Sequence, residues 1–186
     1  MPFFKENNVL FAVLCMAQKI GYTFCMKKTN AMRILDGLKI QYETLSYDDD
    51  GEHKLEHGAA AMTAEKLGID PAAVFKTIVM RTEKKEVVVF CQSALHEINL
   101  KKARTVAGAK EVTPVKQEEL LALTGYVRGG CSPLGMKRKF RTFIDQSALT
   151  HEKVYVSAGL RGEQIALAPA DLVRATGAEA VDLVLE

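Results

Sequence analysis

The sequence predicts a single domain of the α+β class. Segments with helical and with strand-type patterns both occur along the chain, but they do not alternate one for one, as a doubly wound parallel sheet requires. The 186 residues correspond to about one domain, and no internal repeat, low-complexity tract or Pro/Gly-rich linker marks a second one. With 48% hydrophobic and 26% charged residues, the composition is typical of a folded protein and excludes a disordered or collagen-like chain.

The first part of the domain is predicted to contain two helices separated by a strand. Helices are predicted where apolar residues recur with the helical period, after a capping side chain and before a glycine that suits a left-handed cap. A strand is predicted where apolar and polar residues alternate. The resulting elements are a helix capped by Thr29 or Asn30, a strand at 41–47, an acidic solvated loop at 48–52, and a helix at 57–67 that ends at Gly68.

The middle of the domain is predicted to contain two neighbouring strands and two further helices. The strands are expected on either side of a charged turn, and their centres are continuously apolar, as in strands that are covered on both faces. Asp70 and Pro71 precede them as a cap and first turn. The elements are strands at 75–81 and 86–91, a helix at 99–107 capped by Asn99 and ended by Gly108, and a helix at 113–124 that starts at Thr113-Pro114.

The last part of the domain is predicted to be mostly β-structure, because strand-type segments dominate after Gly125. A single helix interrupts them after Pro169. The predicted strands are 126–127, 141–145, 154–157, 164–167 and 180–184, and the helix is 171–176.

The first 25 residues differ from the rest and are predicted to lie outside the domain, which then spans 26–186. The apolar run at 9–17 has nine residues, far fewer than the roughly 20 that span a bilayer. A secretory signal is also not predicted, because Glu6 cancels the charge of Lys5 and no small-x-small cleavage site follows. The segment after Met26 resembles the natural start of a cytosolic protein, so we expect a cytoplasmic protein without membrane contact. An appended strand or helix is the alternative for 1–25.

Composition gives no support for a metal or a cofactor. The net charge of +2 does not by itself indicate a nucleic-acid-binding protein. The four cysteines stand far apart without C-x-x-C spacing, and the four histidines are scattered, so neither a zinc nor an iron–sulfur site is expected. We expect reduced thiols in a reducing compartment at Cys15, Cys25, Cys91 and Cys131.

A glycine-rich segment and one lysine are the strongest candidates for a functional site. Residues 124–135 contain four glycines and a proline, and backbone without Cβ atoms can approach a ligand closely and offer it N–H groups. A tight turn between strands is the alternative. Lys76 lies among apolar residues at the start of a strand, where its ammonium could hold a carbonyl or phosphate group. Residues 157–162 end another strand with two glycines, a hydroxyl and a guanidinium.

Two basic clusters could hold a polyanionic backbone beside this site, although a solvated face is the alternative for each. Familiar catalytic signatures are missing from the sequence: we find no G-x-S-x-G elbow, Walker loop or dinucleotide fingerprint, and Cys131 has no acid or histidine beside it. The candidate residues for binding such a backbone are Lys101, Lys102, Lys137, Arg138 and Lys139.

Five motifs that occur in order resemble those of the YbaK/EbsC family, and in particular its Cys-tRNA(Pro) deacylases. The motifs are Val-Phe-Lys-Thr at 74–77, Asn-Leu-Lys-Lys at 99–102, Thr-Gly-Tyr-Val through Ser-Pro-Leu-Gly at 124–135, Val-Ser-Ala-Gly at 156–159, and Arg-Gly at 161–162, with Gly68 before them. The resemblance extends from about Met26 to the C-terminus. It implies a single domain with a mixed, barrel-like sheet flanked by helices, similar to the editing domain of some prolyl-tRNA synthetases.

The resemblance also implies a function, the trans-editing of cysteine wrongly attached to proline tRNA. In this family the thiol of the substrate attacks its own ester carbonyl. The essential lysine of the family corresponds to Lys76, and backbone N–H groups near Gly129 and Gly130 would stabilise the oxyanion. The implied substrate-binding residues are Tyr47, Ser132, Pro133, Gly135 and Ser157. Implied partners are the 3′-aminoacyl end of a mischarged tRNA and a prolyl-tRNA synthetase that supplies tRNA selectivity.

Two other functions stay open at this point. One is a sibling deacylase that clears alanine or another small amino acid with an activated water, and the other is a non-catalytic module that binds tRNA or a synthetase. The chain departs from the family at two positions. Cys131 stands where an aliphatic residue is common, and Gln164 stands where related proteins can carry an acid, so no general base is assigned at Gln164.

Overall fold

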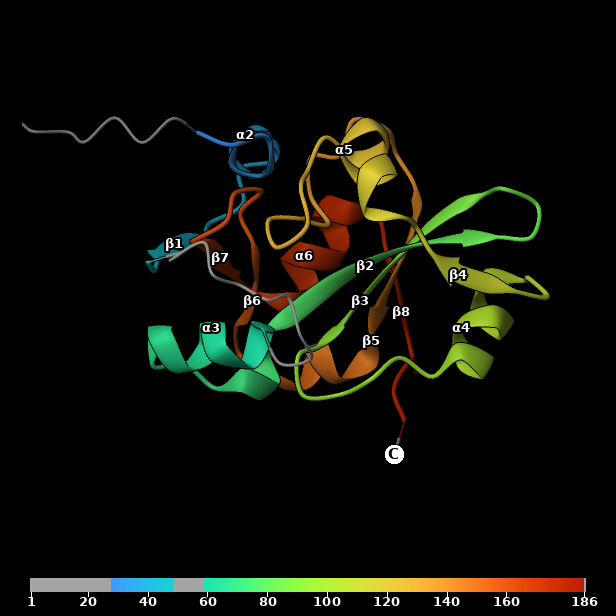
Figure 1. Ribbon diagram of the computed structural model, residues 1–186. Helices are drawn as coiled ribbons and strands as arrows, with labels where there is room; N and C mark the ends of the chain where they lie inside the picture. The colour runs from blue at the N-terminus through green and yellow to red at the C-terminus, as the bar shows by residue number, and fades with distance from the viewer. Residues whose placement is uncertain (1–27, 49–58, 186) are drawn as a thin grey trace, which may run out of the picture.

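The strands form two β-sheets, one of three strands and one of five (Figure 1). The computed structural model describes residues 28–48 and 59–185, so the segment 1–25 and its predicted separation from the domain lie outside the described residues. The three-stranded sheet is antiparallel, in the order β1–β7–β6, with β1 Glu43–Ser46, β6 Val154–Ser157 and β7 Glu163–Leu167. The five-stranded sheet is mixed, in the order β4–β2–β3–β5–β8, with β2 Phe75–Thr82, β3 Val87–Ser93, β4 Val112–Pro114, β5 Arg141–Asp145 and β8 Glu179–Val181.

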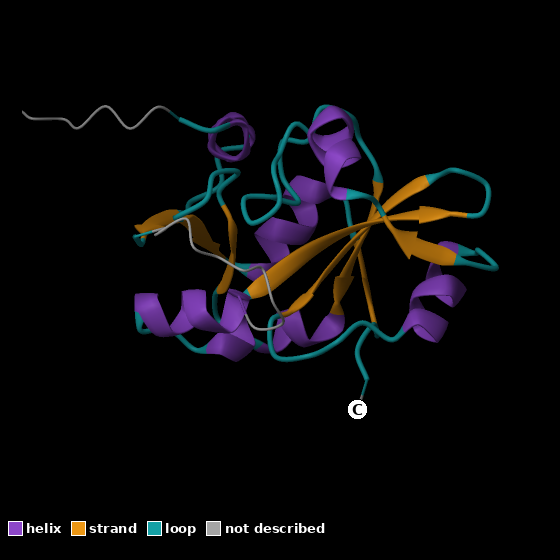
Figure 2. Cartoon of the chain, in the orientation of Figure 1, coloured by secondary structure: helices purple, strands orange, loops and turns teal. Residues whose placement is uncertain are grey.

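Helices flank these sheets, as the cartoon coloured by secondary structure shows (Figure 2). The predicted α+β domain with a mixed sheet and flanking helices is therefore confirmed. The expected barrel is not formed by the described residues, whose strands divide into two sheets. The helices are α2 Asn30–Gly37, α3 Ala59–Leu67, α4 Leu100–Ala107, α5 Gln117–Thr124 and α6 Pro169–Thr176, with short 3₁₀ helices η1 at Pro71–Ala73 and η2 at Gln146–Thr150.

A single parallel bridge joins the two sheets. It pairs Val74, immediately before β2, with Tyr155 of β6. The other end of β2 pairs with β4 through Met80 to Thr82, while the opposite edge of β2 pairs with β3 along almost its whole length. The exposed edge at the start of β2 is therefore used for β6, and the two sheets meet there.

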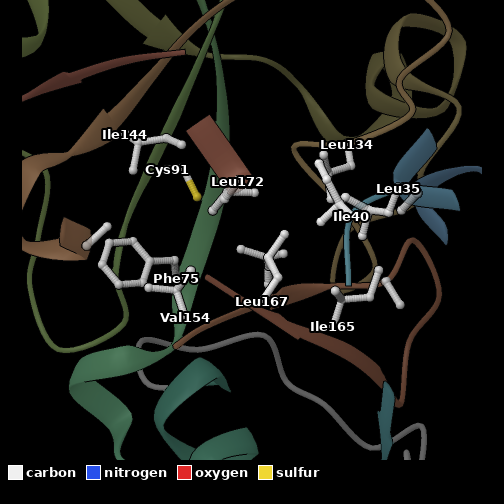
Figure 3. Close-up of a cluster of buried hydrophobic side chains, with 14 of the residues drawn as sticks. Leu35, Ile40, Phe75, Cys91, Leu134, Ile144, Val154, Ile165, Leu167 and Leu172 are labelled. Atoms are coloured by element: carbon white, nitrogen blue, oxygen red, sulfur yellow. The ribbon is translucent and has the colours of Figure 1, made fainter. Parts of the chain in front are cut away.

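One hydrophobic core lies between the two sheets, α2 and α6 (Figure 3). Leu35 of α2, Leu172 of α6 and Ile165 of β7 are completely buried in it, together with Cys91 and Ile144 of the five-stranded sheet. Each fully buried aliphatic side chain of this kind stabilises the fold by about 1.5–3 kcal/mol. This core fixes which face of each strand points inward.

A second core lies on the opposite face of the five-stranded sheet, under α4. Ala103 and Ala107 of α4 pack there on a stacked pair of rings, Phe90 and Phe143, whose centroids are 5.4 Å apart. The continuously apolar strands β2 and β3 are therefore covered on both faces, as predicted.

Local capping signals correctly predicted several boundaries. The Thr29 hydroxyl accepts a hydrogen bond from the Met32 N–H at 3.3 Å at the start of α2. The Asn99 side chain accepts bonds from Lys101 N–H and Lys102 N–H at 3.0 and 3.3 Å, and α4 ends at Gly108 in the left-handed conformation. The predicted strands at 41–47 and 180–184 are shorter in the structure, and residues 57–58 of the predicted second helix lie outside the described residues.

Two predicted elements were wrong. Thr113 and Pro114 do not start a helix; they belong to the edge strand β4, and α5 begins only at Gln117. An edge strand tolerates a proline, because the missing N–H need not take part in a ladder. The strand expected at 126–127 is an irregular segment, in which the buried Tyr126 hydroxyl donates to the Leu134 carbonyl at 2.7 Å.

No helix among the described residues is both long enough and apolar enough to cross a membrane.

Gly135 is expected to be one of the least replaceable residues of the fold. Its φ is +66°, and a Cβ built on it would lie 2.8 Å from the Asn30 carbonyl carbon and 2.9 Å from the Ala31 nitrogen at the start of α2. A left-handed residue with a Cβ costs about 1–2 kcal/mol, and the contact with helix backbone adds about 1–3 kcal/mol. Gly135→Ala should therefore lower the free energy of unfolding, measured by urea denaturation, by about 2–5 kcal/mol.

Gly108→Ala is the matched control for this prediction. Gly108 also has φ +66°, but a Cβ there would meet nothing within 4 Å, so only the conformational cost applies. Equal losses of stability for the two variants would contradict the close approach of Gly135 to α2.

Candidate active site

The pairing of the strands brings four polar side chains into one row across the two sheets. Ser157 of β6 pairs directly with Gln164 of β7, and Lys76 of β2 pairs directly with Gln92 of β3. Val74 and Tyr155 form an isolated parallel bridge, so Lys76 and Ser157, each two residues further along its strand, lie close to the point where the two sheets meet. We call Gln164, Ser157, Lys76 and Gln92, in this order, the polar row.

The polar row faces away from the core between the sheets. Phe75 and Ile165 point into that core (Figure 3), and successive side chains along a strand point to opposite faces. Lys76 and Gln164, each one residue away, therefore lie on the other face, and the pairing with β7 gives Ser157 the same direction. The row therefore lies on the side of the strands that points away from this core, where Gln92, Ser157 and Gln164 are buried and Lys76 is partly exposed.

Tyr47 and α3 lie on the same side of the three-stranded sheet. Tyr47 follows β1, and its backbone N–H donates to the Gly162 carbonyl at 2.8 Å, which continues the pairing of β1 with β7. The Tyr47 hydroxyl accepts a hydrogen bond from the Thr63 hydroxyl of α3 at 3.3 Å. In Figure 1, α3 lies at the end of the molecule that carries the three-stranded sheet, below β1 and β7 in the view. The structure therefore brings Tyr47, Lys76 and Ser157, three predicted site residues, to one face.

Lys76 has an ion-pair partner that the sequence did not indicate. Its Nζ lies 3.3 Å from an Oε1 of Glu97, and the Lys76 side chain is 25% exposed, compared with 61% for Glu97. The loop that carries Glu97 is fixed by two hydrogen bonds, from Gln92 Nε2 to the His96 carbonyl at 2.8 Å and from the Leu185 N–H to the Glu97 carbonyl at 3.3 Å. A solvated pair of this kind is worth at most about 1 kcal/mol, so an anionic group can replace Glu97.

Two side-chain carbonyls of the polar row have no hydrogen-bond partner among the described residues. They are the Oε1 atoms of Gln92, which is completely buried, and of Gln164, which is 7% exposed. Buried polar atoms are nearly always hydrogen-bonded, so both glutamines require an explanation. Sequence analysis missed Gln92 and treated Gln164 only as a departure from the family. The available signal was an amide inside an otherwise apolar strand.

The glycine-rich segment packs against the turn that follows Ser157. A Cβ at Gly130 would lie 3.0 Å from the Arg161 nitrogen and 3.1 Å from the Leu160 carbonyl carbon, and Arg161 Nε donates to the Arg128 carbonyl at 2.9 Å. The Gly130 N–H already donates to the Val127 carbonyl at 3.0 Å, so in this conformation it is not available for the predicted oxyanion contact. Gly129 is exposed, with φ +86°.

Two of the predicted substrate-binding residues are buried, and a third packs against the backbone of a helix. Ser132 is completely buried, and its hydroxyl accepts a hydrogen bond from the Leu134 N–H at 3.3 Å. Pro133 is also buried, and Gly135 lies against the start of α2. These positions anchor the glycine-rich segment to the core rather than bring it to the polar row.

Comparison with known proteins identifies the family. The model of the aminoacyl-tRNA editing domain matches residues 56–175. A protein of Enterococcus faecalis named "Putative Cys-tRNA(Pro)/Cys-tRNA(Cys) deacylase EbsC" is 37% identical over 157 residues, which cover 84% of this chain and 93% of that protein. The chain belongs to the aminoacyl-tRNA editing domain family.

Two further proteins are similar to this chain, one in its fold and one in part of its sequence. A crystal structure described as "a putative trans-editing enzyme for prolyl tRNA synthetase" superposes with a TM-score of 0.69 over 84% of this chain and 98% of that chain, at 23% identity, and supports the fold. A proline–tRNA ligase of Brachyspira hyodysenteriae is 32% identical over 72 residues, which cover 39% of this chain and 12% of the ligase.

The predicted tRNA-binding residues of this editing domain have different surroundings. The Lys102 ammonium binds the Asp182 carboxylate at 2.7 Å and the Val184 carbonyl at 2.9 Å, so it fixes the C-terminal segment. The Lys137 ammonium donates to the Leu121 carbonyl of α5 at 3.1 Å. Lys101, Arg138 and Lys139 are exposed. In Figure 1, α4, which carries Lys101, lies at the opposite end of the molecule from the three-stranded sheet.

The thiols of the described part of the editing domain are not activated. Cys91 and Cys131 are both free, and burial raises the pKa of each thiol to about 12. Cys131 is therefore neutral near pH 7 and is a poor nucleophile. In the described ranges, no group of three or more histidine, cysteine, aspartate or glutamate residues could hold a metal ion.

Cys131 should be dispensable for catalysis and inert in the folded protein. With a pKa of about 12, only about one thiol in ten thousand is ionised at pH 8. We expect Cys131→Ser to keep more than half of the wild-type rate, and iodoacetamide at pH 8 to leave Cys91 and Cys131 unmodified for hours, as read by peptide mass mapping. The same peptides from urea-unfolded protein are the control. Rapid native alkylation of Cys131, or loss of activity in Cys131→Ser, would contradict this conclusion.

Proposed function

We propose that this editing domain is a trans-editing deacylase that removes cysteine from mischarged tRNA(Pro), and that residues 26–186 are sufficient for it. The observation that carries the proposal is the strand pairing that brings Lys76, Ser157 and Tyr47 to one face. The relationship to EbsC supports the substrate, and the similarity to part of a proline–tRNA ligase supports prolyl-tRNA synthetase as a partner.

The proposed chemistry uses the thiol of the substrate as the nucleophile. The cysteinyl sulfur attacks the carbonyl carbon of its own ester, and a C–S bond forms while the bond to the ribose oxygen breaks. The thiol proton is transferred in net terms to that oxygen, so the products are free tRNA and a cysteine thiolactone, which water then opens to cysteine. Because thiol and carbonyl are already joined, the protein needs only to hold a reactive conformation. This agrees with the neutral thiols of Cys91 and Cys131.

Lys76 is the proposed cation of the site. Its ammonium would exchange the solvated carboxylate of Glu97 for the terminal phosphate or for the oxygen that becomes negative during the attack. The hydroxyls of Ser157 and Tyr47 would orient the ester and the ribose. The exposed Gly129 stays a candidate oxyanion donor, whereas Ser132, Pro133 and Gly135 would act by holding the segment that carries it.

Lys76→Ala should abolish deacylation while leaving the fold unchanged. The expected effect is a loss of at least about a hundredfold in kcat/KM for Cys-tRNA(Pro), because one preorganised charge at a reacting oxygen is worth about that much. The measurement is the release of radiolabelled cysteine, with circular dichroism to check the fold.

Lys153→Ala is the matched control for Lys76→Ala. Lys153 lies just before β6 and also forms an ion pair with a glutamate, Glu43 at 2.6 Å, but it is outside the polar row. It should keep the wild-type rate. Full activity of Lys76→Ala, or equal losses in the two variants, would contradict the assignment of Lys76.

A panel of Cys-, Ala-, Ser- and Pro-charged tRNA(Pro) tests the substrate and the chemistry together. We expect rapid release of cysteine only, and no release when the thiol of Cys-tRNA(Pro) is blocked with iodoacetamide. Release of alanine, or undiminished release of the blocked cysteine, would instead support a deacylase that uses water. No turnover of any member would favour a non-catalytic binding module.

The exposed cations Arg138 and Lys139 are the proposed contact with the tRNA backbone. Replacing both with glutamine should weaken tRNA(Pro) binding about three- to tenfold at 50 mM salt and lower the slope of log K against log salt by about 1–2. The control is Lys84→Gln with Lys85→Gln, which removes the same charge from the exposed turn between β2 and β3. The same salt slope for both double variants would assign Arg138 and Lys139 to a solvated face.

A further inference from the structure

We propose that Gln164 selects substrates with a free α-amino group. In this proposal, which rests on the proposed function, the Gln164 Oε1 accepts a hydrogen bond from the α-ammonium of the aminoacyl ester. The site would then act on aminoacyl-tRNA and reject tRNA whose amino acid is blocked at nitrogen, as in peptidyl-tRNA or N-formyl-aminoacyl-tRNA.

The first argument is the state of the Gln164 side chain itself. Gln164 is 7% exposed, and its Oε1 is buried without a hydrogen-bond partner among the described residues. An acceptor left in this state costs about the desolvation of one polar group, which a donor from a ligand would recover. Packing of the core between the sheets does not require a buried glutamine at this position, because the next residue of β7, Ile165, supplies the side chain that points into that core.

The second argument is the place of Gln164 in the polar row. Gln164 pairs directly with Ser157, and the bridge between Val74 and Tyr155 brings the start of β2, which carries Lys76, to the other edge of the same strand β6. On its far side, Gln164 pairs with Leu45 of β1, two residues before Tyr47. The unpartnered carbonyl therefore belongs to a residue that lies between strands carrying Ser157 and preceding Tyr47, two of the residues proposed to hold the ester.

The third argument is the charge order along the row. Strands are about 4.8 Å apart, so Gln164 and Lys76 are separated by about 10 Å, which one aminoacyl ester and part of its ribose can bridge. A cationic α-ammonium is repelled by Lys76 and attracted by a carbonyl oxygen, whereas the ester oxygen and the terminal phosphate are attracted by Lys76. The order Gln164, Ser157, Lys76 therefore matches the order ammonium, Cα and ester along the substrate.

A neutral amide also suits this position better than a carboxylate would. Gln164 can accept from an ammonium without adding a negative charge that competes for Lys76. Among the described residues, Lys76 forms an ion pair with one carboxylate, that of the exposed Glu97. An incoming anion can replace it. The charge of Lys76 then stays available for the anionic end of the substrate.

The test compares Cys-tRNA(Pro) with N-acetyl-Cys-tRNA(Pro) as substrates of wild type and Gln164→Met at pH 6.5. Methionine keeps the length of the side chain and removes the acceptor. A hydrogen bond to a charged donor corresponds to about a ten- to hundredfold change in kcat/KM. We expect the ratio of kcat/KM for the free amine to kcat/KM for the acetylated amine to be larger in wild type than in Gln164→Met by about that factor. Acetylation changes the reactivity of the ester equally for both proteins, so the ratio of ratios isolates the contact.

Equal discrimination by wild type and Gln164→Met would overturn the inference, and Gln117→Met, on the exposed first residue of α5, should behave as wild type. If Gln164→Met does not fold, Gln164→Glu decides the question because it keeps both shape and acceptor. Discrimination retained or enlarged in Gln164→Glu supports the contact, and discrimination lost refutes it. A wild type that deacylates no aminoacyl-tRNA would refute the proposed function, whereas turnover with unaltered ratios would refute only the role of Gln164.

Discussion

The parallel bridge between Val74 and Tyr155 is the contact on which the arrangement of this molecule depends. It is the point where the three-stranded and five-stranded sheets meet, and it sets which residue of β2 lies beside which residue of β6. A slip of one residue would turn Lys76 into the core and Phe75 outward, because the side chains of a strand alternate between faces. Phe75 is 2% exposed inside a core shared by both sheets, so the burial of this ring keeps Lys76 on the face that points away from that core.

The glycine-rich segment contributes to the site mainly through packing. Gly159, in the turn after Ser157, has φ +96°, and a Cβ there would lie 2.7 Å from Cε1 of the buried Tyr126. Gly130 meets the backbone of the same turn, so the two segments are held together by close contacts that only glycine allows. The turn that follows β6 therefore packs against Tyr126 and Gly130, and the position of Ser157 depends on residues that need not touch a substrate.

Local signals predicted much of the fold, and pairing between distant segments accounts for the rest. The boundaries of α4 follow from Asn99 and Gly108, which act within one turn of the helix and can be recognised in the sequence. The Thr113-Pro114 pair has equally good local chemistry for a helix start, but its pairing with β2 takes precedence. In the same way, family resemblance could name Lys76. Its partner Glu97 and the hydrogen bond from the Gln92 amide to the His96 carbonyl depend on a loop folded over the sheet, which no periodicity in the sequence reveals.

The polar row combines a cation whose ion-pair partner is easily exchanged with two buried carbonyl oxygens that have no hydrogen-bond partner among the described residues. Lys76 is held by a partly solvated carboxylate, so its exchange for an anion costs little, while Gln92 and Gln164 present carbonyls that the protein leaves unsatisfied. Such a surface gains more from a ligand that carries both a cation and an anion than from either ion alone. An aminoacyl ester at the end of a tRNA has this character, with its ammonium and its phosphate separated by one ribose. The chemistry proposed for this chain then needs no strong base or nucleophile from the protein. It needs a row of side chains that favours a cation at Gln164 and an anion at Lys76.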